Sequence, residues 1–285
     1  MYQQSVLSRY QQDGFIFPLK AMSELQAEDY RYNLESVESN YRKNPDYLYA
    51  LNGGINFVLP LVDEITTRPE ILDQVEEMIG PDIVVFSASL FIKEAQSPQY
   101  VSWHQDLTYW GLSGAEEVTA WVALSPATVE SGCMRMIPGS HRYQLVAHTD
   151  TFKSDNLLTR GQQLAVNFDE SEAVDVVLAP GEFSLHHGYT FHGSRPNLSN
   201  NRRIGLSISY VSTSMRLRSG VKPVTRLARG SDSYGHFEFA NLPKGVFDAG
   251  DVAAMRRAKD IAESFYYQGT ERRLATDVIG KDRMD

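Results

Sequence analysis

The sequence predicts a mainly β protein with supporting helices, built as a double-stranded β-helix, the cupin-like jelly roll. From residue 82 onward the hydrophobic pattern changes to a period of two, which is typical of strands. The strand-like runs are short, and turn signals such as Pro138-Gly139 and Pro180-Gly181 separate them. Many short strands punctuated in this way favour a sandwich or barrel over a fold of alternating strands and helices.

The first eighty residues are predicted to be mostly helical. Residues 5–13 show a short helical pattern, followed by an apolar run that ends at Pro18. A second helix is expected to begin near Ser23, a good capping residue. A third covers residues 68–79, where apolar side chains recur at helical spacing before Gly80.

The jelly-roll core is expected over about residues 81–215. Runs that are rich in β-branched and aromatic residues, or that alternate between apolar and polar residues, are predicted strands; they cover 83–93, 118–125, 174–178, 183–187 and 204–211. Beyond this core, residues 216–285 are expected to form a loop and an amphipathic helix over 249–267. No repeat or low-complexity linker interrupts the chain, so we predict one domain spanning 1–285.

Composition excludes several classes of protein. The chain has 285 residues, of which 42% are apolar and 22% charged, so a globular core is expected and disorder is not. Its 27 basic and 36 acidic side chains give a net charge of −9. Nucleic-acid binding relies on basic stripes that neutralise phosphates, so this balance predicts no nucleic-acid partner. The oligomeric state is not predicted.

Cysteine usage and hydropathy indicate a compartment. The single cysteine, Cys133, excludes an internal disulfide framework and fits a reducing environment. Residues 1–6 have neither the basic start nor the apolar run of a signal peptide. No stretch approaches the roughly 18 uninterrupted apolar residues that a membrane span requires. We therefore expect a soluble, cytoplasmic protein with no membrane partner.

His104 and Asp106, together with the distant His192, are candidate metal ligands. Alternate side chains of an extended chain point the same way, so His104 and Asp106 are expected to project together. Two imidazoles and one carboxylate can occupy one face of an octahedral metal and leave the other face open, which is the arrangement of non-haem Fe(II) oxygenases. If the three residues meet in space, the sequence predicts an enzyme that activates dioxygen.

Other histidines compete for these roles. A second triplet of the same type, His148-Thr149-Asp150, leads into the polar stretch 153–156, which indicates a surface loop, so it is the weaker ligand pair. His186 and His187 are alternatives to His192, which ends a strand-like run. The strand end is a plausible ligand position, but the residues alone leave this choice open.

Several segments together resemble the phytanoyl-CoA dioxygenase family of Fe(II)- and 2-oxoglutarate-dependent oxygenases. The resemblance spans about residues 82–211, with a family-like opening at 10–15. It rests on Trp103-His104-Gln105-Asp106, on residues 132–141, and on His192-Gly193-Ser194 with Arg202-Arg203. It implies a double-stranded β-helix with His104, Asp106 and His192 as the ligands of Fe(II).

The resemblance also implies a site for 2-oxoglutarate. In the family, an arginine about eleven residues after the distal histidine anchors the far carboxylate, and Arg203 matches this spacing better than Arg202. Arg203 shares a strand face with small residues, which suggests room for an anion, and a guanidinium can grip a carboxylate with two parallel hydrogen bonds. Ser194 is expected to donate to the same carboxylate. Trp121 is expected to pack near the cosubstrate, although ordinary core packing also explains a tryptophan there.

Three further residues are candidates for contact with the substrate. Lys93 is placed to meet cosubstrate or substrate, although a solvated lysine is the ordinary alternative. Tyr109 and Trp110 follow the ligands closely and are candidates for the wall of a substrate pocket. Residues 132–141 are expected to be scaffold. The basic stretch 216–229 suggests either a lid over an anionic substrate or, more typically, a solvated loop.

These features predict an Fe(II)- and 2-oxoglutarate-dependent hydroxylase of a small-molecule metabolite, which consumes O2 and releases succinate and CO2. Asp106 argues against the halogenases built on this scaffold, which have glycine or alanine there so that chloride can bind the iron. Desaturation, cyclisation and epimerisation begin with the same hydrogen abstraction and stay open. A non-oxidative metal-dependent isomerase or binding protein with this fold also stays open, and it would need the metal ligands but not 2-oxoglutarate.

Overall fold

The computed structural model describes residues 5–267. Over this range the chain divides into two compact units whose segments alternate along the sequence. Unit 1 contains residues 5–28, 91–108 and 118–206, and unit 2 contains residues 29–90, 109–117 and 207–267. The single domain predicted from the sequence stays a prediction, and the end of the predicted C-terminal segment, 268–285, lies outside the described residues.

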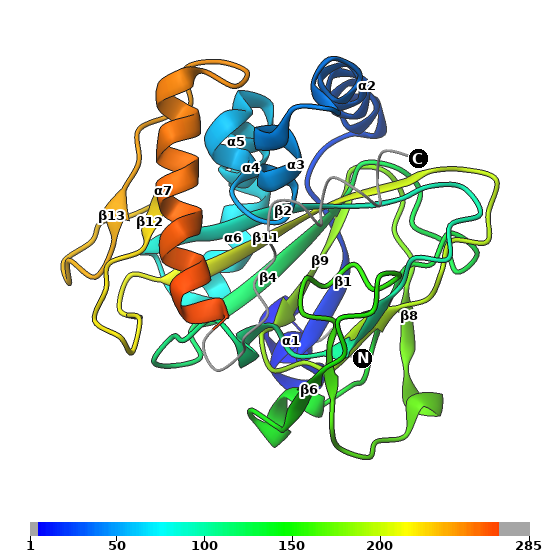
Figure 1. Cartoon of the computed structure of the whole chain (residues 1–285). Helices are drawn as coiled ribbons and strands as arrows, with labels where there is room; N and C mark the ends of the chain where they lie inside the picture. The colour runs from blue at the N-terminus through cyan, green and yellow to red at the C-terminus, as the bar shows by residue number, and fades with distance from the viewer. Residues whose placement is uncertain (1–4, 268–285) are drawn as a thin grey trace. The chain divides into compact units, whose positions relative to one another are not determined.

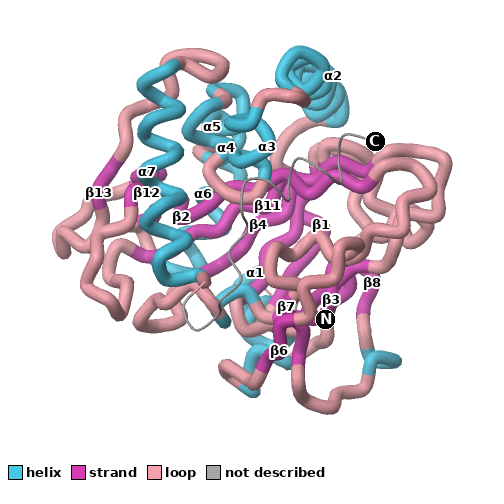
Figure 2. Tube along the Cα trace, viewed as in Figure 1, coloured by secondary structure: helices cyan, strands magenta, loops and turns pink. Residues whose placement is uncertain are grey.

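Unit 1 has a layered β architecture. Its strands are β1 (Phe15–Lys20), β3 (Val101–His104), β4 (Glu117–Ala123, from Val118 on), β5 (Met134–Met136), β6 (His148–Asp150), β7 (Gln162–Leu164), β8 (Val174–Val176), β9 (Glu182–His187), β10 (His192–Ser194) and the first residues of β11 (Arg203–Ser212). One sheet contains β1, β9, β4 and β11 in that order, a second contains β3, β10, β5 and β8, and β6 pairs with β7. Figure 2 shows that long loops connect the short strands β6, β7 and β8.

A buried apolar cluster joins the two larger sheets of unit 1. Phe15 from β1 and Trp121 from β4 belong to the same cluster as Met134 and Met136 from β5 and Val176 from β8. Two layers of strands that bury their facing side chains in this way form one hydrophobic core. The mainly β, jelly-roll class predicted from the sequence is confirmed.

The five predicted strands hold within two residues at each end. The apolar run that was expected to end at Pro18 is a further strand, β1, which was not predicted. Proline has no N–H to donate, so it is normally excluded from the interior of a sheet. Here Pro18 lies in β1 where the pairing with β9 is irregular, between Ile16 and Leu19. The strand therefore continues past the residue that the sequence analysis treated as its end.

The helix α1 (Val6–Asp13) precedes β1, and α2 (Glu24–Tyr41) begins at the predicted place. The side chain of Ser23 accepts from the backbone N–H of Gln26 at 3.2 Å, and the side chain of Gln26 accepts from the backbone N–H of Ser23 at 3.0 Å. This reciprocal capping box satisfies two amide donors that the first turn of a helix leaves unpaired.

Unit 2 contains both helices and strands. It contains the rest of α2, α3 (Pro45–Leu51), α4 (Ile55–Val58), α5 (Pro60–Thr66), α6 (Pro69–Ile79) and α7 (Ala249–Tyr266). Its strands are the end of β11, β2 (Ile83–Lys93) as far as Leu90, β12 (Val224–Arg229) and β13 (Glu238–Phe239), in that order. As Figure 1 shows, α7 runs beside β12, and it also packs on α4.

The predicted helices over 68–79 and 249–267 are confirmed as α6 and α7. The helices α3, α4 and α5 were not predicted, because each has seven residues or fewer and is too short to display a helical period. None of the helices within residues 5–267 has the length and apolar character needed to cross a membrane.

The basic stretch 216–229 is not simply a solvated loop. Its second part is the strand β12, where Nε of Arg226 lies 3.2 Å from the carboxylate of Asp63. Arg229 pairs with Asp73 and Glu76, each at 2.8 Å. These ion pairs explain the two basic residues structurally, so neither is needed for an anionic substrate.

Candidate active site

His104 and His192 lie opposite each other on neighbouring strands of unit 1. His104 ends β3 and His192 begins β10, and the antiparallel pairing of these strands makes the two residues partners in register. Their ring centroids are 4.1 Å apart, and both side chains are buried. Strand pairing thus brings together two candidate ligands that are far apart in the sequence.

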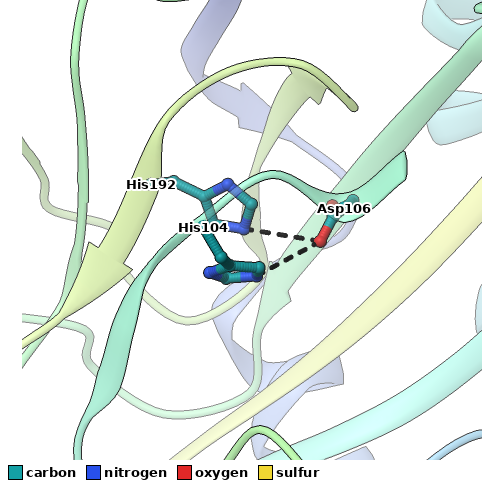
Figure 3. Close-up of side chains that lie close together, drawn as sticks. All are labelled: His104, Asp106 and His192. Carbon is teal, nitrogen blue, oxygen red and sulfur yellow. Dashed lines mark ion pairs between the residues drawn. The ribbon is translucent and has the colours of Figure 1, made fainter. Parts of the chain in front are cut away.

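Asp106 completes the group. The strand β3 ends at His104, and Asp106 opens the 3-10 helix η1 (Asp106–Thr108), so a turn rather than an extended strand presents the carboxylate. Its Oδ1 lies 3.4 Å from Nε2 of His104 and 3.6 Å from Nε2 of His192. Figure 3 shows the three side chains converging. Their ligand atoms lie within 4.8 Å of one another, and no second group of this kind occurs within residues 5–267.

Backbone carbonyls orient both imidazoles. Nδ1 of His104 donates to the carbonyl of Ser102 at 2.9 Å, and Nδ1 of His192 donates to the carbonyl of Thr190 at 3.0 Å. Each bond leaves the lone pair of Nε2 facing Asp106, as in metal-binding histidines whose other nitrogen is fixed by a carbonyl. Burial lowers the pKa of His192 well below its usual value, which keeps this ring neutral.

The other oxygen of Asp106 has its own partners. Oδ2 accepts from Oγ1 of Thr119 at 2.9 Å and from Nε2 of His186 at 3.1 Å. Burial raises the pKa of Asp106, but the favourable contacts of its carboxylate with the surrounding histidines, among them the hydrogen bond from His186, outweigh it. The pKa of Asp106 therefore stays well below its usual value, and the ionised carboxylate presents Oδ1 to a cation.

The two histidines that competed with His192 lie outside the ligand group. His186 donates to Asp106 and supplies no third ring to the group. His187 follows it on the opposite face of β9, and its Nδ1 accepts from the backbone N–H of Tyr189 at 3.0 Å.

A buried glutamine fixes the turn between the ligands. The side chain of Gln105 donates to the carbonyls of Gln144 at 2.6 Å and Tyr189 at 2.7 Å, and it accepts from the N–H of Val146 at 2.9 Å. Its backbone N–H donates to Nε2 of His148 at 3.1 Å. Burial lowers the pKa of His148 to about 4, so this nitrogen is a neutral acceptor. Sequence reasoning missed both residues, because neither has a spacing that signals this role.

The second His-X-Asp triplet is structural. His148 supports Gln105, and Asp150 forms an ion pair with the guanidinium of Arg160. The triplet itself is the strand β6, and the exposed loop expected nearby begins only at Lys153. Its carboxylate already has a cation as partner, so the discounting of this pair as a metal site is consistent with the structure.

Unit 1 also contains two buried cations that share one carbonyl. Lys93 ends β2 with 0% of its surface exposed, and Arg203 begins β11 with 1% exposed. Nζ of Lys93 donates to the carbonyl of Gly132 at 3.4 Å, and Nη1 of Arg203 donates to the same oxygen. Lys93 also donates to Oγ of Ser194 at 2.6 Å and to the carbonyl of Arg195. The solvated state that the sequence analysis gave as the ordinary alternative for Lys93 is wrong.

Neither cation has a carboxylate partner within residues 5–267. Burial and the charge of Arg203 lower the pKa of Lys93 to about 6, and burial lowers the pKa of Arg203 to about 10. Nε of Arg203 is buried with no hydrogen-bond partner among the described residues. Buried cations without a counter-charge are strongly unfavourable, so this pair indicates a site that binds an anion.

Strand β10 connects the two parts of the site. It carries His192 at its first residue and Ser194 at its third, and alternate residues of a strand point to the same face. The hydroxyl of Ser194 touches Nζ of Lys93 at 2.6 Å. The candidate ligands and the cation pair therefore belong to one contiguous arrangement within unit 1.

Trp121 packs in the core and also covers the arginine. Its ring belongs to the apolar cluster of unit 1, and Cζ of Arg203 lies 5.2 Å from the ring centroid. The indole also fills the space above Gly205, where an added Cβ would lie 1.8 Å from it. The room for an anion that the small residue suggested at this position is therefore occupied by Trp121.

The sequence also matches a known family. The model described as phytanoyl-CoA dioxygenase (PhyH) matches residues 10–205, which is more than half of the chain. The chain belongs to the phytanoyl-CoA dioxygenase family. The matched range contains the three candidate ligands and both buried cations.

Individual members of the family and solved structures show the same relationship. Phytanoyl-CoA dioxygenase domain-containing protein 1 homolog of Caenorhabditis elegans is 27% identical over 168 residues, which are 56% of this chain and 58% of that protein. A probable alpha-ketoglutarate-dependent hypophosphite dioxygenase of Stutzerimonas stutzeri is 27% identical over 155 residues, 52% of each chain. The apo structure of the non-heme monooxygenase ThoJ is 31% identical, with a TM-score of 0.84, over 93% of this chain and 98% of that chain. The chain spans little more than half the length of the two curated relatives.

One family-like segment contributes more than the scaffold role expected of it. Gly132, in the stretch 132–141, provides the carbonyl that accepts from both Lys93 and Arg203. Its φ is +69°, and an added Cβ would lie 2.3 Å from the carbonyl oxygen of Arg195. Only glycine fits this position. The glycine itself was the available signal, because a glycine beside a family motif often marks a close backbone approach.

The two aromatic substrate candidates lie in unit 2. The ring of Tyr109 contacts that of Tyr266 at a centroid distance of 5.9 Å, and the ring of Trp110 contacts that of Phe86 at 5.5 Å. Tyr109 and Trp110 are partly exposed. Their role as walls of a substrate pocket stays a prediction for this member of the family.

Proposed function

We propose that this protein is an Fe(II)- and 2-oxoglutarate-dependent oxygenase that hydroxylates a C–H bond of a small-molecule metabolite. One observation carries the proposal. Unit 1 combines a His104–Asp106–His192 group with a buried pair of cations, Lys93 and Arg203, that has no carboxylate partner between residues 5 and 267. The ligand group alone occurs in many metal proteins. The buried cation pair offers positive charge to a dianionic cosubstrate.

The residues present fit a ferrous ion. His104 and His192 offer their Nε2 atoms, and Asp106 offers Oδ1, which together form the two-histidine, one-carboxylate set of non-haem Fe(II) oxygenases. When bound, iron and 2-oxoglutarate would supply the activation of O2 and the removal of a substrate hydrogen, with release of succinate and CO2. The protein holds the ligand atoms in place through the hydrogen bonds of both imidazoles and of the Asp106 carboxylate.

Arg203, Lys93 and Ser194 fit one end of 2-oxoglutarate. Within the part of the chain that the structure describes, Nε of Arg203 has no hydrogen-bond partner and is available to a carboxylate oxygen. A guanidinium can make two parallel hydrogen bonds to such a group. Lys93 and the hydroxyl of Ser194 lie 2.6 Å apart and offer further donors. We therefore assign Lys93 to the cosubstrate rather than to the substrate. Trp121, stacked on Arg203, keeps the guanidinium in position.

The names of the relatives support this proposal. The protein of Stutzerimonas stutzeri is named an alpha-ketoglutarate-dependent dioxygenase, and ThoJ is named a non-heme monooxygenase. We extend the common element, oxygen chemistry at a non-haem metal, to this chain. The substrate itself, the absence of a nucleic-acid partner and the cytoplasmic location stay predictions.

Succinate release tests the proposal. Protein incubated with Fe(II), O2 and 2-oxoglutarate should release succinate, and the variants His104→Ala and Asp106→Ala should release none. Full turnover by both variants would end the proposal. Arg203→Met should raise the KM for 2-oxoglutarate by about 10- to 100-fold, since a hydrogen bond to a charged group is worth about 1.5–3 kcal/mol.

The same assay separates the alternatives. A non-oxidative isomerase or binding protein would release no succinate, and substitution of Arg203 or Ser194 would change little in its activity. Mass analysis of products from a substrate screen distinguishes the oxidative outcomes. Hydroxylation adds one oxygen atom, desaturation or ring closure removes two hydrogens, and epimerisation leaves the mass unchanged.

A further inference from the structure

The two oxygens of the Asp106 carboxylate have different surroundings. Oδ1 faces Nε2 of His104 at 3.4 Å and Nε2 of His192 at 3.6 Å. Oδ2 points the other way and accepts two hydrogen bonds, from Thr119 at 2.9 Å and from His186 at 3.1 Å. One oxygen is therefore directed at the candidate metal position, and the other is occupied by the protein.

The two donors are built into a sheet. Thr119 lies on β4 and His186 on β9, and the antiparallel pairing of these strands makes them partners in register. Both are only 1% exposed. Directly opposed residues on neighbouring strands have their side chains on one face, so the sheet itself sets the spacing of the two donors. Functional groups held by strands are more precisely placed than groups on loops.

The hydrogen bond to Asp106 accounts for an otherwise unfavourable histidine. An ionised carboxylate is an acceptor only, so Nε2 of His186 carries the proton of this hydrogen bond. The other ring nitrogen, Nδ1, is buried with no hydrogen-bond partner within residues 5–267. A buried polar atom without a partner opposes folding. An apolar ring of the same size would avoid that cost, but it could not donate a hydrogen bond to Asp106.

We propose that Thr119 and His186 are positioning residues that hold Asp106 as a one-oxygen metal ligand. This inference rests on the proposed metal site. A carboxylate with both oxygens free can bind an ion through both, and it would then occupy four of six octahedral positions together with the two histidines. With Oδ2 held, the protein occupies three positions and leaves three for cosubstrate and O2. The donors also keep the carboxylate from turning away from the two imidazoles.

Titration with Co(II) alone, without cosubstrate or turnover, tests this inference. Cobalt suits the same imidazole and carboxylate ligands, and its visible absorption depends on coordination number. Thr119→Val removes one donor at nearly constant volume, and His186→Phe removes the other while keeping a ring. Each should weaken Co(II) binding by about 10- to 100-fold, as loss of a hydrogen bond to a metal ligand typically does. Each should also change the visible spectrum of the bound ion.

Matched variants separate positioning from general damage. Thr119→Ser and His186→Gln keep a donor, and they should restore most of the affinity and the wild-type spectrum. Thr225→Val and His187→Phe are controls of the same chemical type. Oγ1 of Thr225 is buried with no hydrogen-bond partner in the described chain, and His187 lies on the other face of β9. Both controls should bind Co(II) like wild type.

The outcomes are distinct. Wild-type affinity and spectrum in both Thr119→Val and His186→Phe would overturn the inference while leaving the metal site intact. Equal losses in the controls, or no recovery in the donor-keeping variants, would also overturn it, because the effect would then be structural. If wild-type protein binds no Co(II), the proposed function fails first.

Discussion

At the scale of single residues, Lys93 is the side chain that departs most from its ordinary state. It is fully buried, it faces Arg203, and these two factors lower its pKa to about 6. The sequence placed it correctly at the end of a strand but favoured solvent, because strand parity says nothing about what covers the strand. Its burial beside a second cation follows from the loop at Gly132 and the end of β10, which are distant in the sequence.

Lys93 should make 2-oxoglutarate binding depend on pH. A bound carboxylate favours the charged amine, so the pKa of Lys93 is higher in the complex than the value of about 6 without an anion. Between these two pKa values, binding takes up a proton. The KM for 2-oxoglutarate should therefore be constant below about pH 6 and rise as the pH increases above it. In Lys93→Met the increase of KM with pH should disappear. If KM increases with pH in this variant as it does in wild type, another group is responsible for the effect.

The same residue should oppose folding. The pKa of Lys93 is about 6 in the folded protein and 10.5 in its ordinary state, so the unfolded chain binds more protons between these values. Its contribution to stability thus improves as pH rises through this window and worsens as pH falls toward 6. Lys93→Met should stabilise the cosubstrate-free protein at neutral pH, by about 1–4 kcal/mol if it resembles other replacements of buried charges. A melting temperature below that of wild type would contradict this account.

At the scale of elements, strand pairing and one tight loop assemble the site. The register of β3 with β10 sets His104 against His192, and that of β4 with β9 sets Thr119 against His186. The sequence predicted β9 and most of β4 but not which strands would be neighbours, because pairing between distant strands has no local signal. The choice of His192 over His186 therefore rested on family resemblance, and the register gives its physical reason.

Gly132 offers a test of the loop. In Gly132→Ala the new Cβ would meet the carbonyl of Arg195, and the φ of +69° is unfavourable for alanine. The backbone must shift to relieve this clash, so the melting temperature should fall. The shift should also move the carbonyl of residue 132, which accepts from both cations, so the KM for 2-oxoglutarate should rise. Gly220→Ala is a matched control, since its φ is +77° and nothing lies within 4 Å of an added Cβ. Equal effects of the two substitutions on KM would show that the clash at Gly132 is irrelevant.

At the scale of the whole molecule, a protein with a negative net charge contains a buried site with two positive charges. The net charge is −9, yet the two buried cations of unit 1 have no carboxylate partner within residues 5–267. The period of the hydrophobic pattern predicted the mainly β class correctly. Composition predicted a globular chain without a nucleic-acid partner, and the second part of that expectation stays a prediction. Composition carried no information about Lys93 and Arg203, since the placement of two charges among 63 ionic side chains does not change an average.

The visible spectrum of the anaerobic protein with Fe(II) and 2-oxoglutarate tests the central claim most directly. The account predicts a weak charge-transfer band that requires both additions, that is lost in Asp106→Ala, and that needs much more 2-oxoglutarate in Arg203→Met. The absence of a band in the wild-type protein would contradict it. So would a titration with 2-oxoglutarate that is the same as that of wild type in Asp106→Ala or in Arg203→Met.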